Sequence, residues 1–202
     1  GARTLIDLVS SAETLPALKR AKSRDLDISA SVSINHLALN ELDIGDYRSF
    51  AKLDPPLRDE MDRRALIDAV NDGTIDIVVS AHDPRPAGEK RRPFCESAAG
   101  AVGLEILLPA ALTLIADDQL NLMAFLKAVT INPAELLGLP QGRICEGAPA
   151  DLVLIDPDKP WQCDAADLRS QSKNTPFDGR FMQGRAVMTI CAGKIVFDSS
   201  TA

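Results

Sequence analysis

Short apolar runs alternate with helix-periodic segments through the first 140 residues of the chain. Residues 4–9, 26–34 and 75–80 are rich in aliphatic and β-branched side chains, a pattern that predicts three strands. Between them, apolar residues recur at helical spacing over 15–22 and 60–70, which predicts two amphipathic helices. Strands that are separated by helices pair in parallel through crossovers. The pattern therefore indicates an α/β fold with the helices on the outer face of the sheet.

Local signals predict where several elements begin and end. Ser10 or Ser11 is the expected N-cap of the first helix, and Asn35 and His36 fall in an expected loop after the second strand. The helical pattern also predicts three helices downstream, at 102–115, 122–130 and 132–138. The last of them combines an expected cap at Asn132 with a proline in the first turn and a glycine at the end.

The pattern becomes strand-like in the last third of the chain. Residues 151–155 predict a strand that ends at the Asp156-Pro157 step. Residues 186–191 and 194–197 predict a β-hairpin whose two-residue turn is Ala192-Gly193. A boundary near residues 139–146 separates an α/β part from a small β part, at 1–140 and 141–202.

Composition limits the classes of function. The 202 residues are 46% hydrophobic and 25% charged, an ordinary globular balance with enough apolar side chains for a sizeable core. The net charge of -7 argues against nucleic acids and acidic membrane surfaces as partners, because a protein needs a basic face to bind either of them. The most apolar segment, 102–116, is interrupted by Glu105 and Pro109 and is too short to span a bilayer.

The cysteines indicate the redox environment. All four are distant from one another in the sequence and none forms a CxxC pair: Cys95, Cys145, Cys163 and Cys191. This spacing indicates free thiols in a reducing cytoplasm rather than a disulfide framework or a zinc knuckle. We see no signal peptide and expect a cytoplasmic protein.

The first residues suggest that the fold continues elsewhere. The chain begins at Gly1, almost at once in a predicted strand, so we expect a fragment whose beginning is missing. Three strand–helix units are too few to close a barrel, and an open sheet exposes its edges. We therefore expect the missing part, or another copy of the chain, to complete the sheet.

Six short motifs occur in an order that is specific to one family. They are the segments 54–58 (DPPLR), 72–76 (DGTID), 100–105 (GAVGLE), 131–134 (INPA), 146–152 (EGAPADL) and 172–179 (SKNTPFDG). Together they resemble the C-terminal half of dihydroorotase, a cyclic amidohydrolase of pyrimidine biosynthesis, and the resemblance covers essentially the whole chain. It implies that 1–140 are the last three βα units of a TIM-type (β/α)8 amidohydrolase barrel and that 141–202 form part of a small β-sandwich.

The resemblance also implies a chemistry. Active dihydroorotases bind zinc at the mouth of the barrel, where it activates water, and an aspartate on the last strand moves protons. In this sequence a metal-binding histidine is replaced by Leu8 and the catalytic aspartate by Ala81. A substrate-binding asparagine is replaced by Asp54, and a substrate-binding histidine by Arg85. Leucine has no lone pair for zinc, alanine moves no proton, and Asp54 repels an anionic substrate.

These four substitutions predict a non-catalytic dihydroorotase-like protein. We expect no catalytic residue and no bound zinc, and by resemblance a structural association with aspartate carbamoyltransferase. The alternative is an active zinc-dependent dihydroorotase that hydrolyses the cyclic amide of dihydroorotate, favoured by the family resemblance and the intact framework. Asp83 or His82 would then replace the lost groups. The shift from Ala81 to Asp83 moves a side chain by ~6.6 Å along a strand, which argues against this replacement.

Other residues near the motifs have both structural and functional interpretations. His82 and Gly100 are the candidate remnants of a substrate pocket, although a loop histidine bonded to the backbone is the favoured interpretation of His82. Gly100 and Gly103 predict close backbone packing at the start of a helix. In the family, Asn35 and His36 correspond to a histidine pair outside the metal shell, so His36 is expected to be structural.

Three charged or aromatic features complete the predictions. Arg58 is expected to meet an anion or to form an ion pair with Asp59, Glu60 or Asp62. The run Lys90-Arg91-Arg92 resembles a phosphate-binding patch, but it is expected to be a solvated loop. Trp161 is expected in a buried core position rather than in a stacking role.

Overall fold

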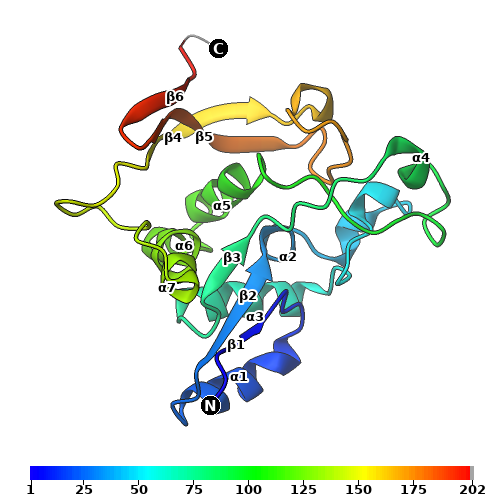
Figure 1. The fold of residues 1–202 in the computed structure, drawn as a ribbon. Helices are drawn as coiled ribbons and strands as arrows, with labels where there is room; N and C mark the ends of the chain where they lie inside the picture. Colours follow the sequence, from blue (N-terminus) through cyan, green and yellow to red (C-terminus); the bar gives the residue numbers. More distant parts are fainter. Residues whose placement is uncertain (201–202) are drawn as a thin grey trace.

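A three-stranded parallel sheet forms the centre of the α/β part of the molecule (Figure 1). The computed structural model describes residues 1–200, and the strands are β1 (Thr4–Ile6), β2 (Ile28–Ser33) and β3 (Ile77–Val79). β2 lies in the middle, with Thr4 paired to Ile28 on one side and Ser31 paired to Ile77 on the other. The predicted parallel pairing of these three strands is confirmed.

All three strands are shorter than the sequence predicted, and β1 and β3 end early for the same reason. Leu8 and Ala81 have backbone φ angles of 54° and 45°, which take the chain out of the extended conformation. β1 therefore ends at Ile6 and not at Val9, and β3 ends at Val79. Apolar composition alone does not reveal such a turn, because leucine and alanine rarely adopt it.

The helices that connect the strands are amphipathic, as predicted. The crossovers contain α1 (Leu15–Lys22) and α3 (Glu60–Asn71), which cover the same side of the sheet. Four short 3-10 helices lie in the connections: η1 (Ala12–Thr14), η2 (Glu41–Ile44), η3 (Ser49–Ala51) and η4 (Ala165–Asp167). The Ser11 hydroxyl accepts a hydrogen bond from the Glu13 N–H at the start of η1, so the predicted cap belongs to this turn.

Two short helices were not predicted, and one of them is α4 (Ala87–Lys90), in the loop that follows β3. Residues Ile34–Ala38 form α2 directly after β2, where the sequence suggested a loop. The Ser33 hydroxyl accepts from the Asn35 N–H and caps it. A five-residue helix gives too short an apolar period to be recognised. It positions Asn35 and His36 at the carboxyl end of β2.

Three helices follow β3: α5 (Leu107–Ala116), α6 (Leu122–Val129) and α7 (Ile131–Leu137). The predicted helix at 102–115 begins later, because residues 103–106 form a turn before it, closed by the Ile106 N–H donating to the Gly103 carbonyl. The N-cap of α7 is Thr130 and not Asn132. The Asn132 side chain instead donates to the Asp76 carbonyl over 2.7 Å. Gly138 ends α7 in the left-handed conformation, with a φ of 68°.

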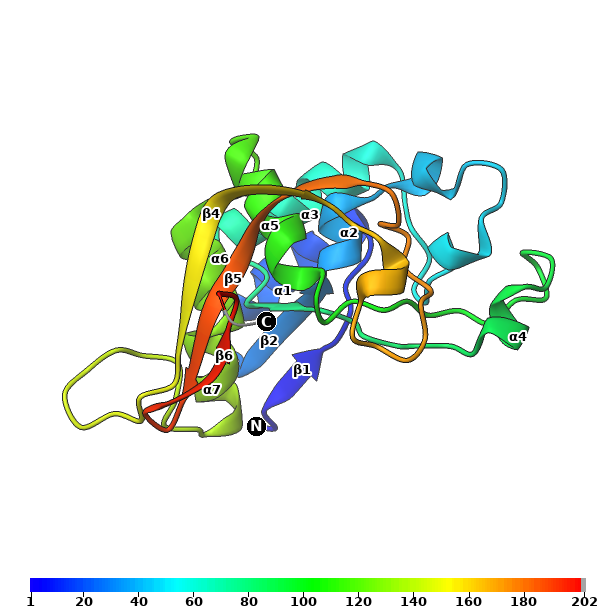
Figure 2. The same cartoon turned by 90° about the horizontal axis from the view of Figure 1, so that it is seen from above.

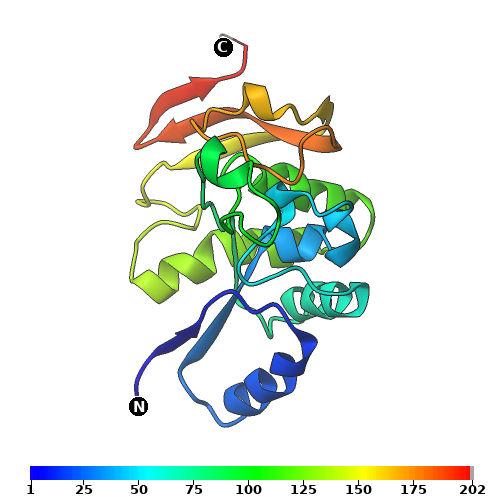
Figure 3. The ribbon, with the colours of Figure 1, turned by 90° about the vertical axis from the view of Figure 1, so that its right-hand side faces the viewer.

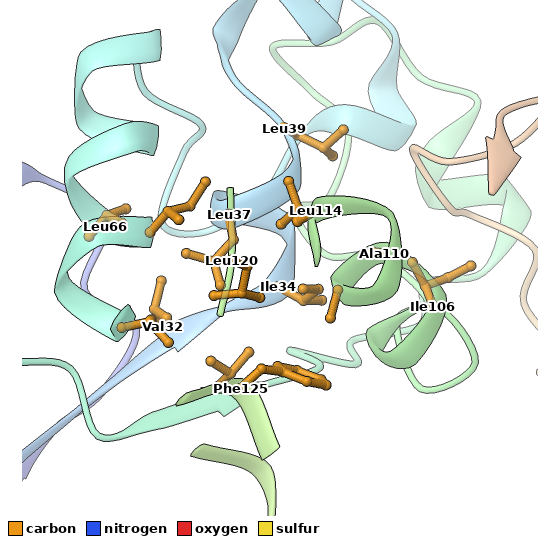
Figure 4. Close-up of a cluster of buried hydrophobic side chains, with 14 of the residues drawn as sticks. Val32, Ile34, Leu37, Leu39, Leu66, Ile106, Ala110, Leu114, Leu120 and Phe125 are labelled. Atoms are coloured by element: carbon orange, nitrogen blue, oxygen red, sulfur yellow. The ribbon is translucent and has the colours of Figure 1, made fainter. Parts of the chain in front are cut away.

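A single apolar core joins these elements (Figure 4). Val32, Ile34 and Leu37 come from β2 and α2, and they meet Leu66 of α3 and Phe125 of α6, all at most 1% exposed. Burial of each such side chain contributes about 1.5–3 kcal/mol. The same cluster includes buried residues of the second sheet and its connections: Cys163, Leu168, Phe177 and Met182. The core is therefore continuous from the first sheet to the second.

The second sheet is antiparallel, in the order β4 (Leu152–Gln162), β5 (Phe181–Cys191) and β6 (Lys194–Asp198). It forms a separate layer over α5 (Figures 2 and 3). The hairpin turn at Ala192 and Gly193 is confirmed, with φ angles of 48° and 77°.

The first two strands of this sheet are longer than predicted. β4 continues past Pro157 to Gln162, because the register shifts between Asp156 and Pro160 and such an irregularity accommodates a proline that has no N–H. β5 starts at Phe181 instead of residue 186. Within residues 1–200, no helix is both long and apolar enough to cross a membrane.

Candidate functional site

A cavity of about 220 Å³ opens where the parallel strands end. Because the carboxyl ends of parallel strands meet at one edge of a sheet, residues from three strands converge there. Its wall comprises Leu8, Ser33, Asn35, His36, Leu53, Asp54, Pro55, Ala81, His82, Asp83, Gly100 and Ala101. The structure thus brings together eight of the residues that the sequence singled out: Leu8, Asn35, His36, Asp54, Ala81, His82, Asp83 and Gly100. Arg85 does not line the cavity.

Leu8 and Ala81 place aliphatic side chains in this wall. Each follows a strand, and each has a positive φ angle that residues other than glycine, asparagine, aspartate and histidine rarely adopt. The Leu8 turn is fixed because its N–H donates to the Ser31 hydroxyl over 2.9 Å, while that hydroxyl donates to the Asp7 carboxylate. Backbone strain of this kind typically costs about 1–3 kcal/mol and gathers at functional sites. Here it presents side chains that carry no acid, base or ligand atom.

We predict that Ala81→Gly stabilises the protein by about 1 kcal/mol, since glycine adopts the positive φ without strain. Urea unfolding of the two proteins measures the difference. Ala116→Gly is the matched control. It lies at the exposed end of α5, and there the same change should destabilise by about 1 kcal/mol. Equal destabilisation by both changes would contradict the assignment of strain to Ala81.

His82 is bonded to the backbone, as favoured from the sequence. Its Nδ1 accepts hydrogen bonds from the N–H groups of Gly103 and Leu104, over 3.2 and 3.4 Å. His82 also forms a parallel bridge with Ala101. With Nδ1 as an acceptor, the ring proton lies on Nε2. His82 therefore anchors the turn before α5.

The two glycines beside His82 are required by close packing, as predicted. A Cβ on Gly103 would lie 2.2 Å from the Ser80 carbonyl oxygen. Gly100 has a φ of 121°, and a Cβ there would lie 2.5 Å from the Asp83 carboxylate. No side chain fits at either position.

Asp83 and Arg85 form an ion pair at the rim of the site. The Arg85 guanidinium donates to the Asp83 carboxylate over 2.7 Å and to the Ala99 carbonyl over 2.8 Å. The Arg85 backbone N–H donates to the Asn174 side-chain oxygen over 3.0 Å, and the Asn174 side-chain amide donates to the Gly100 carbonyl. Because the Asp83 carboxylate is paired with an arginine, Asp83 is not a free base. The Arg85 guanidinium in turn binds groups of the protein itself.

Asn35 and His36 are buried in the same wall. His36 Nε2 lies 3.1 Å from the Pro55 carbonyl and 3.3 Å from the Pro56 carbonyl, so it donates to both and holds the double-proline turn. Burial lowers the pKa of His36, and the nearby Arg58 adds to the effect, so the ring is neutral. The structural role expected for His36 agrees with these contacts. Its Nδ1 and the Asn35 Oδ1 have no hydrogen-bond partner among the described residues.

The burial of Lys90 was not predicted from the sequence. Arg91 and Arg92 are exposed, as a solvated loop requires, but Lys90 is only 1% exposed. Its ammonium donates to the Ala98 carbonyl over 2.8 Å and more weakly to the Lys52 carbonyl over 3.4 Å. Burial lowers its pKa to about 8, with smaller contributions from the charges of Lys52 and Arg85. No sequence signal distinguishes this lysine from its two neighbours.

Two further residues differ in part from the expectations. Within residues 1–200, Arg58 forms none of the ion pairs expected with its acidic neighbours, because Glu60 instead binds Arg63 and Arg64. Trp161 is half-buried and packs against the apolar core, and its ring also stacks, with the Arg185 guanidinium 3.8 Å from the ring centroid. Its indole N–H donates to the Gly184 carbonyl over 3.3 Å.

The residues at this site do not fit a zinc ion. Leu8 and Ala81 offer no lone pair, His82 Nδ1 is engaged by two N–H groups, and Asp83 is paired with arginine. In the part of the chain that the structure describes, no group of three or more histidine, cysteine, aspartate or glutamate side chains is placed to hold a metal. Zinc chemistry at this cavity would need ligands from outside the described residues.

Comparison with known proteins identifies the family. Residues 11–196 match the amidohydrolase family. The chain is 40% identical to the dihydroorotase of Anaplasma phagocytophilum over 189 residues, 94% of this chain and 42% of that protein. It is 38% identical to the dihydroorotase of Anaeromyxobacter dehalogenans over 204 residues, 100% of this chain and 47% of that one.

A solved structure gives the same result. The L-hydantoinase (dihydropyrimidinase) of Arthrobacter aurescens superposes with a TM-score of 0.93 at 28% identity, covering 98% of this chain and 45% of that one. The chain spans less than half the length of each of these relatives. Fold, motif order and sequence similarity agree, and the chain belongs to the amidohydrolase family.

Proposed function

We propose that this chain is part of a non-catalytic, dihydroorotase-like protein. In this proposal residues 1–140 are the last three βα units of a TIM-type barrel, and residues 141–202 are part of a small β-sandwich. The observation that carries it is the cavity at the strand ends, whose wall includes Leu8 and Ala81. By the resemblance, these two residues occupy the positions of a metal-binding histidine and the catalytic aspartate. Neither side chain can hold a metal or transfer a proton.

The neighbouring groups support the same conclusion. Asp83 and His82, the two candidate replacements for the lost groups, are engaged with Arg85 and with backbone N–H groups. An acid/base group must be free to exchange its proton with the reacting molecule. Asp54 also places a carboxylate in the wall of the cavity, which is unfavourable for an anionic dihydroorotate.

An active zinc-dependent dihydroorotase is the second candidate. Its support is the 40% identity to a dihydroorotase across 94% of the chain. This candidate needs zinc ligands from the remainder of a full-length protein. A barrel of about 250 residues has room for them beyond this chain.

Metal analysis and a ring-opening assay separate the two candidates. We expect the full-length protein to bind no stoichiometric zinc and to leave dihydroorotate intact when zinc is added. A dihydroorotase of ordinary activity, assayed in parallel, controls for the conditions. Zinc-dependent turnover by the unmutated protein would overturn the proposal and support the second candidate.

We also propose the partners. β1 and β3 have unpaired outer edges within the described chain, and Leu5 and Ile6 on β1 are 43% and 37% exposed. Further βα units of the same protein, or another copy, would cover these edges. Aspartate carbamoyltransferase is the proposed external partner, and its co-purification from native extract tests this. A full-length protein that remains monomeric beside that enzyme would contradict it.

A further inference from the structure

A second cavity lies between the antiparallel sheet, the start of α5 and residues 164–169. Its volume is about 510 Å³, and it shares no residue with the cavity at the strand ends. Sites for small molecules are typically about 300–1,000 Å³, with mainly apolar walls and a few polar groups that fix the ligand. The second cavity has this size, and the proposed function does not use it.

Two arginines in the wall of the second cavity lie over aromatic rings that line the same wall. The Arg185 guanidinium is 3.8 Å from the Trp161 ring centroid, and the Arg169 guanidinium is 5.4 Å from that of Phe197. Trp161 is itself held in place, because its indole N–H donates to the Gly184 carbonyl. Stacking of this kind restricts the arginine side chains before any ligand arrives, which lowers the entropy cost of binding.

The N–H groups of both guanidiniums are free for an external acceptor. Within residues 1–200, neither Arg169 nor Arg185 forms a side-chain ion pair, and neither guanidinium donates to a carbonyl or to a side chain. Stacking occupies the face of a guanidinium and leaves the N–H groups at its edge. These groups match the geometry of a carboxylate, which arginine binds through two parallel hydrogen bonds. The two arginines therefore favour an anionic ligand.

Three carboxylates also line the second cavity, and two of them are bonded to the backbone. Glu105 accepts from the Arg169 backbone N–H over 2.7 Å, and Asp164 accepts from the Ala166 N–H over 2.8 Å. The third, Asp167, is exposed to solvent, which screens its charge. Since none of the three forms an ion pair with either arginine, the guanidinium charges remain uncompensated at close range.

The remaining wall of the second cavity is largely apolar. Leu104 and Val153 line it although they are 65% and 53% exposed, and the buried Leu168 lies beside them. Large aliphatic side chains that remain exposed in one cavity are typical of a surface that a binding partner covers. The wall thus provides aliphatic surface for an apolar body and two cationic groups for an anionic end.

We propose that the second cavity binds a small organic carboxylate with an apolar body. The carboxylate accepts hydrogen bonds from the Arg169 and Arg185 guanidiniums, and the apolar body covers Leu104 and Val153. This site goes beyond the proposed non-catalytic function and does not depend on it, because the two cavities have no residue in common.

Three molecules of the same shape test the charge of the ligand. 2-Naphthoate, 2-naphthamide and 2-naphthamidinium are titrated calorimetrically into the full-length protein. We expect 2-naphthoate to bind about tenfold more tightly than 2-naphthamide, and 2-naphthamidinium to give no binding at millimolar concentration. Equal binding of 2-naphthoate and 2-naphthamide, tighter binding of 2-naphthamidinium, or no binding of 2-naphthoate would each overturn the proposal.

Arginine variants of the full-length protein locate the site. Arg169→Gln and Arg185→Gln should each weaken 2-naphthoate binding about tenfold, because each removes a charged donor. Arg185→Lys should weaken it less, about threefold, because lysine keeps the charge and lacks the planar fork. Arg92→Gln, an exposed arginine outside the second cavity, is the matched control and should leave binding unchanged.

The outcome of these variants is decisive because Arg169 and Arg185 are exposed, so their replacement leaves the apolar core intact. Urea unfolding of each variant verifies that it is folded. Unaltered 2-naphthoate binding in either glutamine variant, or equal weakening by Arg92→Gln, would place the ligand elsewhere and overturn the proposal.

Discussion

Ala81→Asp alone is expected to leave dihydroorotate hydrolysis at background, and activity should appear only when Leu8→His is combined with it. An acid/base group typically contributes about 10²–10⁴-fold to a rate, but only when a metal-activated water is available to attack. Leu8 leaves the metal without one ligand, so the aspartate would have no activated water to serve. The measurement is zinc content and ring opening for the two single variants and the double variant of the full-length protein.

The backbone makes this test practical. Ala81 has a φ of 45° and Leu8 a φ of 54°, conformations in which aspartate and histidine are several-fold enriched among non-glycine residues. Both replacements should therefore be accommodated without further strain. Ala192→Asp is the matched control, because Ala192 has a similar φ of 48° in the remote β5–β6 turn. Activity in the Ala81→Asp single variant would show that the metal site survives without a histidine at residue 8.

The strands and helices were largely predictable, because each depends on local side-chain periodicity. Alternating small and apolar residues predicted β2, and the Ala192-Gly193 pair predicted the β5–β6 turn. Elements without a local signal were missed. α2 is too short to show a period, and β4 passes Pro157 only because its partner strand accommodates an irregular register.

The candidate site was partly predictable for a different reason. The motif order identified which residues end the strands, and the glycines at 100 and 103 indicated close packing that the structure confirms. The positive φ angles of Leu8 and Ala81 could not be predicted, since neither residue favours them. The burial of Lys90 could not be predicted from the sequence either. It depends on the carbonyl of Ala98 approaching from another part of the loop.

Lys90 should make the stability of the protein depend on alkaline pH. Its ammonium is buried among Lys52, Arg85 and Asp83, and its pKa falls from 10.5 to about 8. Below pH 8 both the folded and the unfolded protein carry the proton, so the cost of burying the charge is present in full. Between about pH 8 and 10.5 the folded protein releases the proton while the unfolded protein keeps it. The free energy of unfolding therefore rises with pH through this window.

Comparison with Lys90→Met isolates this one proton. The variant fills a similar volume and cannot titrate at residue 90, so other groups cancel in the difference between the two proteins. From about pH 7.5 to 9.5, wild type should gain about 2 kcal/mol in unfolding free energy relative to Lys90→Met, measured by urea unfolding. The exposed Lys127→Met is the control and should run parallel to wild type. If the unfolding free energy of Lys90→Met also runs parallel to that of wild type across this pH range, the lysine is not buried as a cation. The loop would then open to water in solution.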